Sequence, residues 1–277
     1  MMASFYWDGD PAVGAVVLRS AALDVVSGLC HGFSTRRGGA SVGERASLDF
    51  GADSQGGARE ENRRRLGARV GLDVTSLYTV HQVHGSRVIE IDGAHAPAAV
   101  TAEEADALWT DVPGLSLGVV TADCVPVLIA DRQGCAVAAA HAGWRGLVAG
   151  VLGKTVDVFV RRGIAASSLV AAIGPHIGVE AYEIGEEVAR HFEALDMELG
   201  HGAVLQRGRS KPHLDLGAVA QAALVSAGVS QVTRTRHGTA REASLFFSHR
   251  REPSGGRQLS VIGIMAGEGA LPPGLCP

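Results

Sequence analysis

The sequence is poor in cysteine and in aromatic residues, and it carries no excess of basic charge. Among 277 residues, four are cysteine and 5% are aromatic, and the formal net charge at pH 7 is −4. Without a basic stripe, neither a nucleic acid nor an anionic membrane surface is an expected partner. The cysteines are too sparse for a disulfide scaffold, which favours a reducing compartment. They are Cys30, Cys124, Cys135 and Cys276.

Long hydrophobic runs and a secretory leader are missing too. The apolar stretch LGVVTADCVPVLIA is interrupted by Asp123 and is shorter than the ~18 residues that cross a membrane. The start, MMASFYWDGDPAVG, places aromatic and acidic residues where a signal peptide has basic and then apolar ones. We therefore expect a cytoplasmic protein that acts on small molecules.

The composition indicates one globular domain over residues 1–277. Hydrophobic residues make up 46% of the chain and charged residues 19%, which is enough for a sizeable core. No Pro/Ser-rich or single-charge linker divides the sequence. The 37 glycines indicate many tight turns.

Apolar periodicity predicts a mixed succession of strands and helices. Residues 77–91 read as a strand pair folded at Gly85-Ser86, and residues 245–265 as two strands joined by a glycine-rich turn. The glycine-rich loop 36–44 is expected to be mobile and exposed. The other strands are expected at 15–20, 31–36, 115–122, 135–141 and 168–178, and the helices at 56–72, 146–163, 185–195 and 215–228.

His84, Cys124 and His141 are candidate metal ligands, each at or near the end of a predicted strand. Zinc favours this combination, and three protein ligands leave an open coordination position, as in catalytic sites. His81 is a rival ligand, but on a strand it would point to the opposite face from His84. Three unrelated residues in turns or core would give the same pattern without binding metal.

Cys124 also suits the role of a nucleophile, with His141 or His84 as the base and Asp123 or Asp106 as the orienting group. On a regular strand Asp123 would point away from Cys124, which weakens it as a direct partner. An inert buried thiol would explain Cys124 equally simply.

Two glycine-rich stretches could hold an anion. In HAGWRG, backbone N–H groups at a strand-to-helix turn stand beside Arg145, and Arg36 stands beside Gly38-Gly39. The GKT stretch at 153–155 is not a phosphate-binding P-loop, because Val148 occupies the position where that loop has glycine.

Several motifs occur together in the order of a known family. They are HGFSTRRGGAS, ASLDFG, NRRRLG, HQVHGSRV, ADALWT, TADCVPVLIAD, AAAHAGWRG, AAIGPHIGVEAYEIGEEV and FFSHRR with GGR. Over residues 32–262 the chain resembles the laccase-domain family, once called multicopper polyphenol oxidases and now described as multifunctional purine nucleoside enzymes. The combination of VHG, TADC and HAGWRG is far more specific than any single piece.

The resemblance implies a zinc ion bound by His84, Cys124 and His141. It also implies phosphorolysis of adenosine, inosine, guanosine and methylthioadenosine, together with deamination of adenosine. The implied fold is α+β, a sandwich of mixed β-sheets flanked by helices. This chain has Gly238, His249 and Asp49 where relatives carry Cys, Tyr and Asn.

The implied reactions assign further roles as hypotheses. Deamination needs a proton-transfer group, for which Asp106, Asp123 and Glu183 are candidates. Phosphorolysis needs donors for phosphate, for which Arg36 and Arg145 are candidates.

Three different functions compete with this one. A true laccase is disfavoured because it needs several coppers, although copper could bind adventitiously to the same three ligands. A cysteine hydrolase or amidase acting on small peptides or cell-wall precursors would use Cys124 as its nucleophile. A nucleoside sensor would bind its ligand without turnover.

Overall fold

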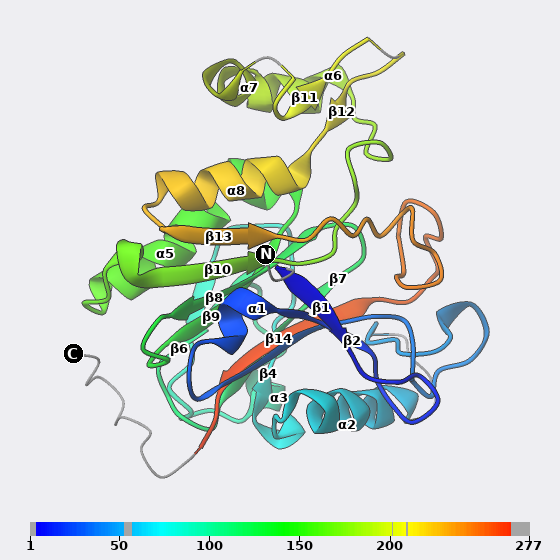
Figure 1. The fold of residues 1–277 in the computed structure, drawn as a ribbon, viewed down its shortest axis with the longest axis vertical. Helices are drawn as coiled ribbons and strands as arrows, with labels where there is room; N and C mark the ends of the chain where they lie inside the picture. Colours follow the sequence, from blue (N-terminus) through cyan, green and yellow to red (C-terminus); the bar gives the residue numbers. More distant parts are fainter. Residues whose placement is uncertain (1–3, 53–56, 201, 209, 267–277) are drawn as a thin grey trace.

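The structure is a computed structural model that describes residues 4–52, 57–200, 202–208 and 210–266. Two six-stranded mixed sheets stack in the middle of the molecule (Figure 1). The first sheet has the order β1 (Phe5–Asp8), β2 (Val17–Ser20), β3 (Leu29–Ser34), β14 (Gln258–Ile264), β7 (Ser116–Thr121) and β4 (Leu77–Tyr78). The second has the order β13 (Gln231–Arg234), β10 (Leu169–Ile173), β8 (Val125–Asp131), β9 (Val137–Ala142), β6 (Ala107–Thr110) and β5 (Val88–Glu90).

Helices flank these sheets, and a small strand pair lies apart from them. The α-helices are α1 (Ala21–Asp24), α2 (Ala58–Val70), α3 (Pro97–Val100), α4 (Trp144–Val148), α5 (Val151–Arg161), α6 (Glu186–Ala189), α7 (Glu193–Leu199) and α8 (Leu216–Ser226). The pair consists of β11 (Leu205–Gln206) and β12 (His213–Leu214), which lie with α6 and α7 at the top of Figure 1. Short 3-10 turns cover Gly43–Arg45, Val74–Ser76, Ala166–Ser168 and Arg190–Phe192.

Strand β8 shows how the sheets are buried on both faces. Val127 and Ile129 pack on the side of α5 and α8, whereas Leu128 and Ala130 pack into the core between the sheets. Because both faces are buried, β8 reads as a nearly continuous apolar run. The sequence-based expectation of a sandwich of mixed sheets flanked by helices is confirmed.

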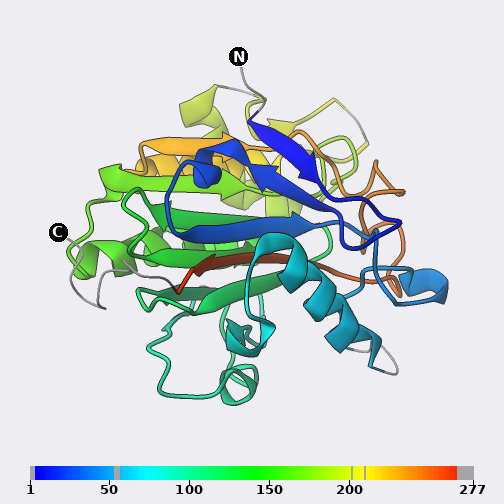
Figure 2. The same ribbon diagram turned by 60° about the horizontal axis from the view of Figure 1, so that its bottom comes forward.

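Helix α2 covers the outer face of the first sheet, across which it runs in Figure 2. Its Leu66 and Val70 pack with residues of that sheet in a third core cluster. Buried Asn62 accepts a hydrogen bond from the N–H of Ala40 and donates to the carbonyl oxygen of Asp49. The helix is therefore fixed to the sheet on one side and to the preceding loop on the other.

The segment 77–91 is not the expected strand pair. Its first two residues form β4 and pair with the first sheet, whereas β5 pairs with the second. The chain between them crosses from one sheet to the other in irregular conformation. His81 and His84 therefore do not lie on one regular strand, and strand geometry does not place them on opposite faces.

Three further expectations are corrected. The loop 36–44 is exposed only in part: Arg37 and residues 42–44 face solvent, whereas a side chain at Gly38 or Gly39 would collide with backbone atoms of neighbouring segments. The helix expected at 146–163 divides at Gly150, whose φ of 78° ends α4 before α5 begins. Of the two strands expected in 245–265, only β14 forms.

No helix in the described part of the chain is long and apolar enough to cross a membrane.

Cys30 and Cys124 are free thiols, whereas Cys135 is disulfide-bonded.

Candidate metal centre and active site

Three separate segments bring His84, Cys124 and His141 together. His84 lies in the crossing between β4 and β5, Cys124 in the tight turn between β7 and β8, and His141 near the end of β9. Strands β8 and β9 are antiparallel, with Val125 opposite Ala142, so the start of β8 lies beside the end of β9. This pairing places Cys124 next to His141.

The three side chains have the geometry of a ligand group. Their ligand atoms all lie within 4.8 Å of one another, and Cys124 Sγ is 3.8 Å from His84 Nε2. The two imidazole rings meet nearly edge to face, with centroids 4.8 Å apart. His141 is buried and His84 is exposed, so the group is open on one side.

Asp106 is the organising residue behind this group. It is fully buried, and its carboxylate accepts hydrogen bonds from the backbone N–H groups of Val83, His84 and Gly85. Asp106 Oδ1 is also 2.7 Å from His141 Nδ1. Because a carboxylate only accepts, Nδ1 carries the proton and Nε2 stays available as a ligand. One side chain thus orients both histidines.

The side chains of the group perturb one another's pKa values. Burial alone would raise the pKa of Cys124, but hydrogen bonds and charge from His141 and His84 lower it to about 6. Burial alone would lower the pKa of His141, but Asp106 and the Cys124 thiolate raise it to about 9. Burial also opposes ionisation of Asp106, yet the hydrogen bond from His141 lowers its pKa. Without a metal, a thiolate and an imidazolium therefore face each other at neutral pH.

We expect metal-free protein to show an unusually acidic thiol. Alkylation by iodoacetamide should have a pH midpoint near the Cys124 pKa of about 6, because the reactive thiolate is lost as pH falls through that value. The rate is measured between pH 5 and 10 after chelation. Cys30, whose pKa is raised by burial, serves as the internal comparison. A midpoint near 9 would contradict the assignment, and Cys124→Ala should lack the fast phase.

The group opens into a cavity of about 640 Å³. Aromatic Phe50, Trp144 and Tyr182 line it, and apolar Val80, Val120 and Ile177 add to the wall. Its arginines are Arg59, Arg63, Arg145, Arg250 and Arg257. A cavity of this size and mixed lining suits a small molecule with both a ring system and charged groups.

Asp123 lines the same cavity from a strained position. Its φ of 91° turns its side chain away from the direction that a regular strand would impose. The carboxylate accepts from the Thr239 hydroxyl at 2.6 Å and from the Arg250 backbone N–H at 2.6 Å. Asp123 therefore holds two distant loops against the turn that carries Cys124.

Two of the candidate residues lie elsewhere. Glu183 does not line the cavity, and its carboxylate pairs with Lys211 at 3.0 Å. Arg36 does not line it either, because its guanidinium donates to the carbonyls of Ala46 and Ala243 and packs 4.5 Å over the ring of Phe247. Arg36 is thus occupied in holding two loops together, whereas Glu183 forms an exposed ion pair.

The remaining candidates lie at the cavity. Arg145 lines its wall and stacks 4.4 Å over the Trp144 ring. His81 lines it too, but does not belong to the three-ligand group found among the described residues.

The positions that depart from the family pattern have different surroundings. His249 lines the cavity, whereas Gly238 lies outside it. Asp49 is buried, and its Oδ1 accepts from the backbone N–H groups of Gly51 and Arg257. The oxygen of an asparagine would accept the same two bonds, so this departure preserves the local backbone contacts.

The chain is an α/β protein of two mixed sheets, with a possible metal-binding group where segments of both sheets meet. Residues 30–265 match the family described as multi-copper polyphenol oxidoreductase laccase, and the chain belongs to this family.

Individual relatives carry other names. The chain is 38% identical over 261 residues to a purine nucleoside phosphorylase of Deinococcus radiodurans, covering 93% of this chain and 96% of the relative. It is 36% identical over 196 residues to adenosine deaminase RL5 of an unknown prokaryotic organism, covering 68% and 75%. The crystal structure of the Bacillus licheniformis hypothetical protein YfiH matches with a TM-score of 0.84 at 29% identity, covering 95% of this chain and all of that one.

Proposed function

We propose that this protein is a zinc-dependent purine nucleoside phosphorylase that also deaminates adenosine. Its nucleoside substrates are adenosine, inosine, guanosine and methylthioadenosine, and orthophosphate is the second substrate. The observation that carries the proposal is a His-Cys-His group in the wall of a cavity rich in arginine. The names of the relatives support the same reading.

The donor set fits zinc. One thiolate and two imidazoles are ligands that zinc prefers, and their atoms are close enough to share one ion. Asp106 orients His141 in the way that carboxylates orient zinc-bound histidines. With three protein ligands, zinc bound here would keep a position for water and lower the pKa of that water towards ~7.

Side chains of the protein take the roles of proton transfer, ligand positioning and purine packing. Of the three candidate carboxylates, Asp123 alone lines the cavity, so we assign it the proton transfer that loss of ammonia from adenosine requires. Asp106 is a positioning residue, since four donors already occupy its buried carboxylate. Trp144 and Tyr182 offer ring faces against which a purine can pack.

A cysteine hydrolase is the second candidate, because His141 lies between Cys124 and Asp106 in the order of a nucleophile, base and orienting group. The two readings differ in their need for metal. If the purified enzyme contains no zinc and loses its activity on stoichiometric alkylation of Cys124, the hydrolase reading is favoured.

Replacing Asp106 should loosen the metal centre. We expect Asp106→Asn to lower zinc affinity by about 10- to 100-fold. An asparagine amide has only one accepting oxygen and no negative charge, so it cannot replace the carboxylate that accepts from His141 and from the three backbone N–H groups. Zinc affinity is measured by competition with a chromophoric chelator. Asp157→Asn, an exposed site on α5, is the matched control. Equal affinities for the two variants would refute the role of Asp106.

The proposed activity is tested by product analysis with inosine and guanosine. Release of hypoxanthine and guanine should require orthophosphate and should yield ribose 1-phosphate in equal amount. Base release at the same rate without phosphate would identify a hydrolase instead.

A further inference from the structure

The cavity that contains the His-Cys-His group carries a strong local excess of positive charge. Among the described residues, five arginines line it against a single carboxylate, that of Asp123, although the whole chain has a net charge of −4. Such a concentration of guanidinium groups within a cavity favours an anionic ligand.

Helix α2 supplies two of these arginines without partners. Arg59 and Arg63 are four residues apart and therefore share one face of the helix. Within the part of the chain that the structure describes, neither forms a hydrogen bond or an ion pair, and Arg63 Nε is buried without an acceptor. Two adjacent like charges on one helix face are unfavourable by themselves. Their placement is explained if an anion binds between them.

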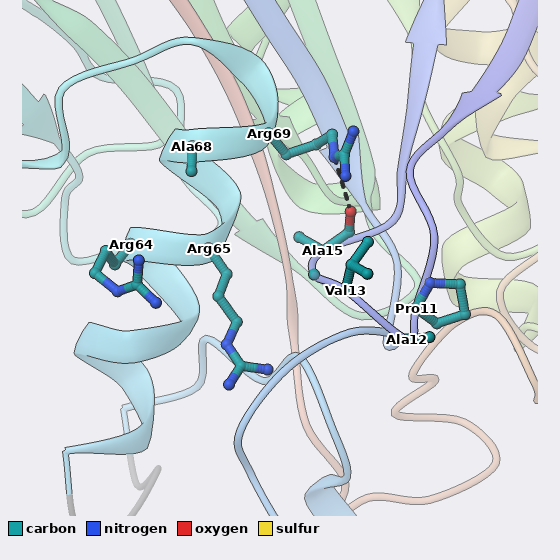
Figure 3. Close-up of a pocket in the computed structure, with 9 residues that line it drawn as sticks. Pro11, Ala12, Val13, Ala15, Arg64, Arg65, Ala68 and Arg69 are labelled. Carbon is teal, nitrogen blue, oxygen red and sulfur yellow. Dashed lines mark hydrogen bonds between the residues drawn. The ribbon is translucent and has the colours of Figure 1, made fainter.

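The other arginines of the same helix are neutralised. Arg64 and Arg65 each bond Glu61 at 2.7 Å, and Arg69 contacts Asp8 at 3.3 Å. Figure 3 draws these three arginines along α2 beside a separate cavity, where Arg69 donates to the carbonyl of Ala15. The contrast within one helix singles out the face that carries Arg59 and Arg63.

Arg257 supplies the third guanidinium, and hydrogen bonds hold both its backbone and its side chain. Buried Asp49 accepts from the backbone N–H of Arg257, and Arg257 Nη1 donates to the carbonyls of Gly255 and Gly256. The other N–H groups of this guanidinium have no hydrogen bond within the described chain. Asn62 fixes α2 to the carbonyl of the same Asp49. Helix α2 and Arg257 are thus anchored to one residue.

The electrostatics of Arg63 agree with an unmet need for an anion. Burial first, and then the positive charge of Arg59, lower the pKa of Arg63 despite the opposing charge of Glu60. In addition, Arg59 lies in the first turn of α2, where the helix macrodipole disfavours a cation. A bound oxyanion would relieve both effects.

We propose that Arg59, Arg63 and Arg257 form a binding site for a phosphate group in the cavity of the His-Cys-His group. This inference rests on the proposed function and replaces Arg36 as the candidate phosphate ligand. In phosphorolysis a phosphate oxygen bonds to C1′ of the ribose while the bond from C1′ to the purine nitrogen breaks. The electron pair goes to that nitrogen, and the proton of hydrogen phosphate ends on the purine, so charge and atoms balance.

The ligand chemistry is that of a phosphate group, which free orthophosphate or a nucleoside 5′-phosphate could supply. We commit to orthophosphate, because the proposed reaction uses it as a substrate. The two sources are distinguished by measuring binding of each in the absence of the other.

The test is equilibrium dialysis of the zinc-loaded protein with radiolabelled orthophosphate, without nucleoside. Wild-type protein should bind phosphate, and Arg63→Gln should weaken binding about tenfold or more, because a charged, forked donor is lost. Arg64→Gln, which removes the same side chain from the exposed face of α2, should bind like wild type. Arg63→Lys should bind weakly as well, since it keeps the charge but not the fork.

Each outcome decides the matter. Phosphate binding that is absent in wild type, or unchanged in both Arg63→Gln and Arg59→Gln, overturns the site. If Arg63→Gln does not fold, as judged by its melting curve, Arg59→Gln and Arg63→Lys supply the comparison. Arg63-dependent binding of adenosine 5′-monophosphate but not of orthophosphate overturns our choice of source. Arg63-dependent orthophosphate binding without any phosphorolysis leaves the site standing and refutes the proposed function.

Discussion

Replacing Cys124 with alanine should remove both the metal and the activity. We expect zinc content to fall from about one ion per chain to less than about 0.1, because two histidines alone do not make a structural or catalytic zinc site. Phosphorolysis and deamination should both fall by roughly a thousandfold or more, because each is proposed to depend on this centre. Metal content is measured on the purified variant by atomic emission, together with product formation.

The other free thiol provides the control. Cys30 is buried in β3, and Cys30→Ala should retain zinc and activity with only a modest loss of stability. If Cys124→Ala kept its zinc but lost activity, the thiol would be acting as a nucleophile, and a cysteine hydrolase would be the favoured function. If Cys124→Ala kept both, the proposed centre would be wrong.

A single methyl group at Gly143 should have nearly as large an effect. A Cβ atom at Gly143 would lie 2.9 Å from His84 Cδ2 and 3.1 Å from Cys124 Sγ, so two of the three ligands must move. We therefore expect Gly143→Ala to lower zinc affinity by about 100-fold or more. Chelator competition measures the affinity, and a melting curve after chelation reports whether the fold survives.

Gly153→Ala is the matched control for this substitution. Gly153 lies in α5 with no atom within 4 Å of an added Cβ, so alanine there should favour the helix slightly. Zinc affinity of Gly153→Ala should equal that of wild type. Unchanged zinc affinity in Gly143→Ala would mean that the ligands bind metal in a different arrangement.

The parts of the fold that the sequence predicts are those with a clear local pattern. The strand expected at 135–141 and the helix expected at 215–228 are examples, since β9 and α8 form there, and Asp215 accepts from the Ala218 N–H at the start of α8. Segment 77–91 misleads because its alternation is strand-like. Its course is determined by Asp106, a distant residue that binds three consecutive N–H groups. No local pattern reports such a contact.

The prediction of two strands in 245–265 is wrong for a similar reason. Phe246 and Phe247 are buried, but the chain there forms turns and irregular structure instead of a strand. The guanidinium of Arg251 donates to the carbonyls of Thr239, Ala240 and Phe246 and so replaces the hydrogen bonds that a sheet would supply. An arginine in this role cannot be told from a solvated one in the sequence.

The site is predictable where a motif names its residues. His84, Cys124 and His141 form a specific combination of motifs, although their wide spacing alone indicates little. Arg59 and Arg63 are hidden among other charges of α2, because only Leu66 and Val70 mark its apolar face in the sequence. Their spacing of four residues, which places them on the same face of the helix, is the one feature of the sequence that indicates a shared site. Arg36 misleads because the neighbouring glycines suggest an open loop, whereas Gly38 and Gly39 pack closely against neighbouring backbone.

The most direct test of the central claim is to incubate the zinc-loaded enzyme with adenosine, with and without orthophosphate, and to follow adenine and inosine by chromatography. We predict that adenine forms only with phosphate, that inosine forms in both cases, and that chelation abolishes both products. Zinc-free protein that consumes no adenosine under either condition would contradict the account.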